Sequence, residues 1–216
     1  MRILTPLQED FMKALGQTSL GESFFLTGGT ALSAFYLFHR YSEDLDFFTD
    51  KEGEINKVVP TVKTIAQKLK SDLNVTKEFS SFAEIFLKSE HETIKLHFAQ
   101  DTPYRLQKVI KNEKYSILID NQLDIACNKL SALFDRYAEK DFVDIYFLSK
   151  EFMPFEEIYK YAREKYIGMD EYWLAVSLKN IDKTEKLPRM IKPVTIEELR
   201  QFYYEKIKFL MKRIKK

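Results

Sequence analysis

The sequence predicts an α+β fold, with a mixed sheet and flanking helices in its N-terminal part and helices alone in its C-terminal part. Segments with strand character all fall before residue 120. From Gln122 onward, apolar residues recur with the i, i+3, i+4, i+7 spacing of amphipathic helices. A chain of 216 residues suits one large domain or two small ones. We expect an N-terminal domain over 1–120, a helical domain over 121–216 packed on it, and a cleft between them.

Composition narrows the class of protein. The 45% apolar and 31% charged residues are ordinary for a soluble globular chain. The net charge of +1 argues against nonspecific coating of nucleic acid, which needs a strongly basic chain. The one cysteine, Cys127, cannot form an internal disulfide. No signal peptide is recognisable, and the longest apolar run is too short for the ~20 residues of a membrane span. We therefore expect a cytoplasmic protein with no membrane partner.

Strands and helices are expected to alternate in the N-terminal part. Thr5-Pro6 opens a first helix that ends near Gly16. Further helices are expected over 30–39 and 54–73, the second one kinked or delayed by Pro60. The expected strands are 23–27, 44–48, 74–79, 82–88, 92–99 and 116–119. Short polar turns separate the three strands between 74 and 99, which predicts an antiparallel meander.

The Gly28-Gly29-Thr30 turn is a candidate phosphate-binding element. It ends an apolar strand and begins a helix. Glycines let the backbone approach a bulky anion and adopt positive φ. The first N–H groups of a helix are unpaired and lie at the positive end of its dipole, which favours phosphate. Thr30 adds a hydroxyl. By itself, such a turn most often only ends a strand.

Asp44 and Asp46 form a candidate metal site. Residues two apart in a strand point to the same side, so both carboxylates face one way while Leu45 and Phe47 face the core. Two acids this close repel each other unless a cation joins them, and hard oxygen ligands suit Mg²⁺, with Mn²⁺ as an alternative. A metal ion beside a phosphate-binding turn is the arrangement that nucleotidyl transfer requires. A lone Asp-x-Asp is usually a solvated strand end, so the pairing with the turn is what matters.

The stretch GGTALSAFYLFHRYSEDLDFF, over residues 28–48, resembles a known signature. A Gly-Gly turn, a helix and Asp-x-Asp on the next strand look like the DNA polymerase beta-type nucleotidyltransferase superfamily. More narrowly, the stretch resembles the AbiEii/AbiGii toxin family of nucleotidyltransferases. The matching residues are Gly28, Gly29, Thr30, Leu32, Arg40, Ser42, Asp44, Leu45, Asp46 and Phe47. The resemblance implies a nucleotidyltransferase fold and a nucleotide-binding role for Gly28, Gly29, Thr30, Arg40 and Ser42.

A second group of residues lies between Lys129 and Asp144. Lys129 and Arg136 are two helical turns apart and share a face, whereas Asp141 and Asp144 lie on the following helix and can hold either cation. From the residues alone, a cleft-facing cation and a solvated salt-bridge face are equally good interpretations. The family resemblance extends here, with Lys140 where arginine is common. It implies that Lys129 and Asp144 are functional and that Lys129 and Arg136 meet the nucleotide.

His97 marks a departure from the family pattern. The superfamily usually supplies a third carboxylate from a later strand, and His97 stands at that position. Three interpretations compete: His97 is the general base or a metal ligand, the enzyme works with two acids, or the site binds nucleotide without turnover. An ordinary strand histidine is the bland alternative. His39 and His91 are expected to be surface residues.

We therefore expect a Mg²⁺-dependent enzyme that transfers a nucleoside monophosphate from a nucleoside triphosphate to an acceptor hydroxyl. Asp44 and Asp46 bind the metal, and the catalytic set is Asp44, Asp46, His97, Lys129 and Asp144. The resemblance implies a toxin of a toxin–antitoxin system, with tRNA or a protein as acceptor and an antitoxin as partner. The alternatives are a non-catalytic nucleotide- or partner-binding protein and a transferase for a small molecule such as an antibiotic.

The last segment, 195–216, is expected to be a helix with a Thr195/Glu198 capping box. Its basic end (Lys212, Arg213, Lys215, Lys216) suits the negative end of the helix dipole. A basic tail that touches RNA or the nucleotide is the alternative.

Overall fold

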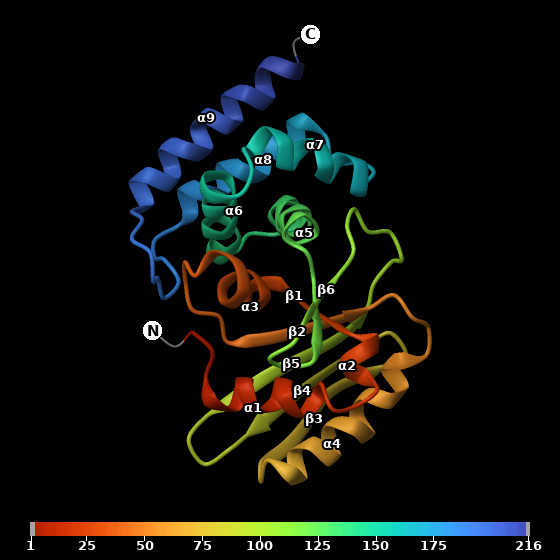
Figure 1. Ribbon diagram of the computed structural model, residues 1–216. Coiled ribbons are helices and arrows are strands. Elements are labelled where there is room, and N and C mark those ends of the chain that lie inside the picture. The colour runs from red at the N-terminus through yellow and green to blue at the C-terminus, as the bar shows by residue number, and fades with distance from the viewer. Residues whose placement is uncertain (1–2, 215–216) are drawn as a thin grey trace. The chain divides into compact units, whose positions relative to one another are not determined.

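The computed structural model describes residues 3–214, and the chain divides into two compact units (Figure 1). The first unit comprises Met1–Tyr36 and Ser42–Asn121, and the second comprises Leu37–Tyr41 and Gln122–Lys216. The chain therefore enters the second unit for five residues before it returns to the first. Among the described residues, no helix is both long enough and apolar enough to span a bilayer.

A mixed sheet forms the centre of the first unit, as the sequence predicts. Within the described residues it has seven strands in the order β3-β4-β5-β2-β1-β7-β6. They are β1 (Phe25–Thr27), β2 (Asp44–Thr49), β3 (Asp72–Phe79), β4 (Phe82–Lys88), β5 (Thr93–Gln100), β6 (Ile110–Asn112) and β7 (Ile117–Ile119). The antiparallel meander β3-β4-β5 is confirmed. β2 runs parallel to β5 and antiparallel to β1.

Helices α1 (Pro6–Leu15), α2 (Leu20–Ser23) and α4 (Val58–Lys68) lie on the apolar face of this sheet (Figure 1). The short helix α3 (Gly28–Leu32) follows β1 on the other side of the strands and continues into a π-helix at Ser33–Leu37, and a 3₁₀ helix at Glu54–Lys57 precedes α4. Phe11 of α1 contacts Phe47 of β2, which stacks on Phe98 of β5 at 5.1 Å between ring centroids. The face of β2 that carries Phe47 is therefore the core face.

Two helices differ from the expectation in their bounds. α4 begins at Val58 rather than at residue 54, because Pro60 is tolerated in a first turn, where its missing N–H would have no partner anyway. It ends at Lys68, and the residues expected to continue it begin strand β3 at Asp72. The helix expected over 30–39 is five residues of α3 that widen into the π-helix and end at Leu37. Phe38 then adopts a φ of +53°, which stops the helix.

The second unit is helical, as predicted from the apolar spacing. Its helices are α5 (Gln122–Asp135), α6 (Glu139–Glu151), α7 (Phe155–Lys165), α8 (Glu171–Lys179) and α9 (Ile196–Ile214), with a 3₁₀ helix at Asn180–Lys183. The Thr195/Glu198 capping box is present, with Glu198 Oε2 accepting from Thr195 N at 2.7 Å. Of the basic residues expected at the end of this helix, Lys215 and Lys216 lie outside the described residues.

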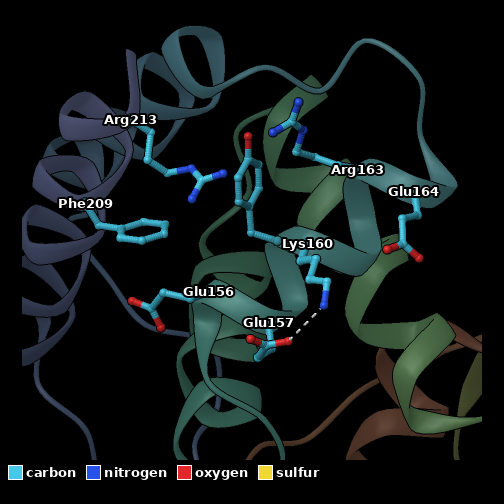
Figure 2. Close-up of a pocket in the computed structure, with 8 residues that line it drawn as sticks. Glu156, Glu157, Lys160, Arg163, Glu164, Phe209 and Arg213 are labelled. Carbon is cyan, nitrogen blue, oxygen red and sulfur yellow. Dashed lines mark ion pairs between the residues drawn. The ribbon is translucent and has the colours of Figure 1, made fainter. Parts of the chain in front are cut away.

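The helical unit contains a pocket of about 540 Å³ between α7 and α9 (Figure 2). Its lining comprises Glu156, Glu157, Tyr159, Lys160, Arg163, Glu164, Phe209 and Arg213. The three acids balance the three bases, and Glu157 pairs with Lys160 at 4.0 Å. Such a lining does not favour a polyanion such as a triphosphate. None of the site residues expected from the sequence lines it.

Candidate active site

The Gly28 turn and Asp46 are in direct contact. Strand β1 pairs antiparallel with β2 so that Thr27 is opposite Asp46, and the chain turns immediately afterwards at Gly28. Gly28 has a φ of +70°, and a Cβ added there would overlap Asp46 Oδ2 and lie 3.2 Å from its Cγ. Only glycine fits this position without strain, because any other side chain would displace the carboxylate. The turn and the carboxylate predicted to work together are therefore neighbours.

Asp44 and Asp46 point to the same side of β2, away from the core. Burial alternates along the strand: Leu45 and Phe47 are fully buried, whereas the two aspartates are partly exposed. The side chain of Asp46 is 27% exposed. The alternation inferred from the sequence thus places two carboxylates on one open face of the sheet.

Thr30 and Ser42 have structural contacts around these aspartates. The hydroxyl of Thr30 is buried and donates to the backbone carbonyl of Asp44, so it fastens α3 to β2. The carbonyl of Ser42 accepts from Gln8 Nε2 at 3.2 Å, and that of Glu43 accepts from the same amide at 2.9 Å. Helix α1 therefore holds the segment that leads into β2. The Thr30 hydroxyl and the Ser42 backbone carbonyl therefore support the position of Asp44, and the predicted contacts of these two residues with nucleotide stay predictions.

A buried polar cluster that was not expected from the sequence supports the turn from the other side. Asp120 is fully buried at the end of β7, where it accepts from Thr27 Oγ1 at 2.7 Å and pairs with Arg105. The guanidinium of Arg105 lies 4.1 Å from the centroid of the Phe25 ring. The signal in the sequence was a carboxylate that directly follows the apolar run of β7. These contacts fix the end of β1 from which Gly28 departs.

His97 lies between two carboxylates on the same face of the sheet. It is opposite Asp46 on one side and Glu84 on the other in the strand register. Its Nδ1 is 2.8 Å from Asp46 Oδ1 and its Nε2 is 3.1 Å from Glu84 Oε2. Ionised carboxylates only accept hydrogen bonds, so both contacts are hydrogen bonds when the ring is protonated and both of its nitrogens donate. Accordingly, the hydrogen bond to Asp46 raises the pKa of His97.

Glu84 is a second residue that was not expected from the sequence. It is opposite His97 in the pairing of β4 with β5, and it is only 8% exposed. Besides His97 it accepts from Lys95 at 3.0 Å and from Thr76 Oγ1 at 2.9 Å. The hydrogen bonds from Lys95 and Thr76 lower the pKa of Glu84 to about 2. No motif indicates this residue, because only the pairing of β4 with β5 brings it to His97.

The donor chemistry of this face fits a divalent cation held by two carboxylates. Mg²⁺ is typically bound through one or two carboxylates, with substrate phosphates and water as the remaining ligands. Asp44 and Asp46 supply such a pair, and Asp46 Oδ2 faces the Gly28 turn. Within residues 3–214, no group of three or more His, Cys, Asp or Glu side chains is arranged to hold a metal. A two-carboxylate site completed by a nucleotide is consistent with both observations.

Lys129 and Asp144 belong to a buried ion-pair network in the helical unit. Lys129 on α5 lies 2.9 Å from Asp141 Oδ1 and 2.7 Å from Asp144 Oδ2, both on α6. Both acids are fully buried and the lysine side chain is 8% exposed. Arg136 reaches Asp141 at 3.3 Å from a more exposed position. The two acids hold both cations, as their spacing suggested.

The segment His39-Arg40 completes this network. Arg40 forms a bidentate ion pair with Asp144, through Nε at 2.6 Å and Nη2 at 2.8 Å. His39 Nε2 lies 2.7 Å from Asp144 Oδ1, and burial lowers the pKa of His39. The expectation that His39 is a surface residue is wrong, because Asp144 and the ring of Phe147 enclose it. His91 is exposed as expected.

Arg40 and Asp144 neutralise each other in this arrangement. Nε and Nη2 of the guanidinium each donate to one oxygen of the Asp144 carboxylate. The two cations Arg40 and Lys129 offset the burial of Asp144 and keep its pKa well below the usual range. Arg40 therefore contacts an acid rather than open solvent. Its predicted contact with nucleotide stays a prediction.

The class of protein indicated by this arrangement is the nucleotidyltransferases. Its features are a mixed sheet, a glycine turn against an aspartate, and a second aspartate on the same face. Comparison with known proteins agrees. The family model "Nucleotidyl transferase AbiEii toxin, Type IV TA system" matches residues 10–213. The chain belongs to this family of nucleotidyltransferase toxins.

Individual relatives extend the comparison. An uncharacterized protein of Aquifex aeolicus is 30% identical over 211 residues, which cover 96% of this chain and 98% of the relative. Among solved structures, JHP933 from Helicobacter pylori matches with a TM-score of 0.62 at 22% identity, covering 97% of this chain and 90% of that one. MenT4, a nucleotidyltransferase toxin from Mycobacterium tuberculosis, matches with a TM-score of 0.56 at 14% identity, covering 95% and 82%. At these identities the structures show a shared fold.

Proposed function

We propose that this protein transfers a nucleoside monophosphate from a nucleoside triphosphate to an acceptor hydroxyl, with Mg²⁺ or Mn²⁺ bound by Asp44 and Asp46. The observation that supports it best is the contact between the Gly28 turn and the Asp46 carboxylate. A phosphate cradled by a glycine turn would lie beside the metal-binding acids, which is the juxtaposition that phosphoryl chemistry requires.

Each part of this face has a definite task in the proposal. The open backbone at Gly28 and Gly29 lets the phosphates approach the sheet. Asp44 and Asp46 hold the metal, which when bound would polarise the α-phosphate and lower the pKa of the attacking hydroxyl. The aspartates stay in place because Thr30, Gln8 and Thr27 fasten the surrounding backbone. Lys129 and Arg136 are proposed to contribute positive charge toward the nucleotide.

The family context supports the biological role. The family is one of toxins in type IV toxin–antitoxin systems. We propose that the acceptor is an RNA end, such as that of tRNA, or a protein hydroxyl, and that a separate antitoxin counteracts the enzyme. Its triphosphate substrate would place its action in the cytoplasm.

A non-catalytic nucleotide-binding role is the second candidate. It is favoured by one observation: His97 already pairs with Asp46 Oδ1, and this cation competes with a metal for that oxygen. In this alternative the protein binds a nucleotide and a partner but does not catalyse transfer.

A label-transfer assay tests the proposal. The purified protein would be incubated with α-³²P-labelled nucleoside triphosphates, total RNA and Mg²⁺. Label should move to RNA or protein, and Asp46→Asn should reduce the rate by at least about 100-fold, the loss typical of removing one key transition-state contact. The matched control is Asp50→Asn, an exposed aspartate just beyond β2, which should retain activity.

Two outcomes would contradict the proposal. Equal labelling by Asp46→Asn, or labelling that persists in EDTA, would remove the metal site from the reaction. Nucleotide binding without transfer to RNA, protein or small hydroxyl acceptors would favour the non-catalytic role.

A further inference from the structure

The two aspartates of β2 face two cations on the neighbouring strand. In the parallel register of β2 and β5, Asp44 is opposite Lys95 and Asp46 is opposite His97. Side chains opposite each other in neighbouring strands share a face of the sheet and lie close together. A cation that is free to reach these carboxylates would neutralise them and compete with a divalent ion.

Glu84 engages both of these cations from the far side. Its Oε2 lies 3.0 Å from Lys95 Nζ and 3.1 Å from His97 Nε2. Its Oε1 accepts from Thr76 Oγ1 at 2.9 Å, and Lys77 lies 3.4 Å away. The carboxylate is thus fixed from both strands that flank it. It therefore holds the ammonium of Lys95, the residue opposite Asp44, and it engages Nε2 of His97 so that the ring contacts Asp46 through Nδ1.

We propose that Glu84 is a positioning residue, which restrains Lys95 and His97 so that the carboxylates of Asp44 and Asp46 remain able to bind a divalent cation. The inference rests on the proposed function of those two aspartates. In this arrangement His97 braces one oxygen of Asp46, and the other oxygen faces the Gly28 turn. Partners that orient metal-binding carboxylates typically change metal affinity 10- to 100-fold when they are removed.

Variants of Glu84 should separate this role from a general contribution to folding. Glu84→Ala releases both cations, and we expect the dissociation constant for Mn²⁺ to rise about 10-fold or more. Glu84→Gln keeps the shape and one acceptor but loses the charge, so its loss should be smaller. Adding Lys95→Ala to Glu84→Ala removes the freed ammonium, so it should recover part of the lost affinity.

The test is a titration of the whole chain with Mn²⁺ alone, in which electron paramagnetic resonance measures the unbound ion. Thermal unfolding of each variant shows whether it is folded. Glu78→Ala is the matched control, because Glu78 is an exposed glutamate on the neighbouring strand β3. It should leave the Mn²⁺ affinity unchanged. Transfer activity, where measured, should fall in the order in which Mn²⁺ affinity falls.

The outcomes distinguish this inference from the proposed function. If Asp46→Asn abolishes Mn²⁺ binding while folded Glu84→Ala and Glu84→Gln bind as well as the wild type, the role of Glu84 is refuted and the metal site stands. If Asp46→Asn leaves Mn²⁺ binding unchanged, the metal site itself is refuted, and the role of Glu84 with it. Should Glu84→Ala not fold, Glu84→Gln decides, and failure of Lys95→Ala to rescue would contradict the role assigned to that lysine.

Discussion

Two ionic clusters of this protein use the same kinds of side chain for different ends. The sheet cluster of the first unit comprises Asp44, Asp46, Glu84, Lys95 and His97. The buried cluster of the helical unit comprises His39, Arg40, Lys129, Asp141 and Asp144. The acids of the buried cluster are wholly enclosed and paired with cations, whereas the two aspartates of the sheet cluster keep exposed surface. We therefore propose that the chemistry takes place at the sheet cluster, and that the buried cluster stabilises the fold in addition to the role proposed for Lys129.

The largest effect should come from the buried cluster. Asp144→Asn removes the negative charge that pairs with both Arg40 and Lys129. Of the acids in the cluster, only Asp141 then remains to offset the two buried cations. Breaking a buried pair by removing one partner typically costs about 3–5 kcal/mol of unfolding free energy. Urea denaturation should show a loss of this size.

Asp135→Asn is the matched control for that change, because Asp135 is exposed at the end of α5. Its unfolding free energy should stay within about 0.5 kcal/mol of the wild type. If Asp144→Asn were as mild as this control, the buried cluster would not be the support described above.

A change of intermediate size is expected at Gly28. Gly28→Ala puts a Cβ against the Asp46 carboxylate, and a misplacement of about 1 Å in such a site can reduce the transfer rate about 100-fold. Gly53→Ala is a close control, since Gly53 has a similar φ of +78° but a Cβ added there would meet no atom within 4 Å. Both variants should lose comparable stability, and only Gly28→Ala should lose metal binding and transfer. Equal transfer by the two variants would contradict the role of the turn.

The two histidines should give the smallest effects, and these should have opposite pH dependence. The hydrogen bond to Asp46 raises the pKa of His97, so the folded state holds the proton more tightly than the unfolded chain. Its contribution to stability is complete below about pH 6.5 and is lost as the pH rises through the raised value. The stability difference between wild type and His97→Gln should therefore shrink toward alkaline pH.

Burial lowers the pKa of His39, which reverses the sign. Its contribution is complete above about pH 6.5 and is lost as the pH falls through the lowered value. The difference between wild type and His39→Gln should shrink toward acid pH. Thermal unfolding from pH 5 to 9 in EDTA checks both trends, with His91→Gln as the exposed control. Parallel trends for His39 and His97 would contradict the contrast between the clusters.

Local patterns in the sequence were sufficient for most of the fold. The alternation of acidic and apolar residues identified β2, the spacing of apolar residues identified the helices of the second unit, and Thr5 caps α1 as expected. The reciprocal contact of Gln8 in that cap was not expected. The short strand β6 was missed, because three residues carry too little pattern to recognise. The end of α4 was misplaced because the residues after Lys68 suit a helix by themselves, and only pairing with β4 makes them a strand.

The arrangement of the candidate site was predictable where its residues are close in sequence. Gly28, Asp44 and Asp46 fall within one strand–turn–helix–strand segment, so local geometry was enough. Glu84 and Asp120 act on that segment through strand pairing and long-range hydrogen bonds, which one sequence does not reveal. His39 was misjudged for the same reason, since its partner Asp144 lies 105 residues away.

The most direct test of the metal site is anomalous diffraction from crystals of the protein grown with Mn²⁺ and a non-hydrolysable nucleoside triphosphate. We expect a manganese peak bound by the carboxylates of Asp44 and Asp46, with the triphosphate against the Gly28 turn. Bound nucleotide with no manganese at these two aspartates would contradict it.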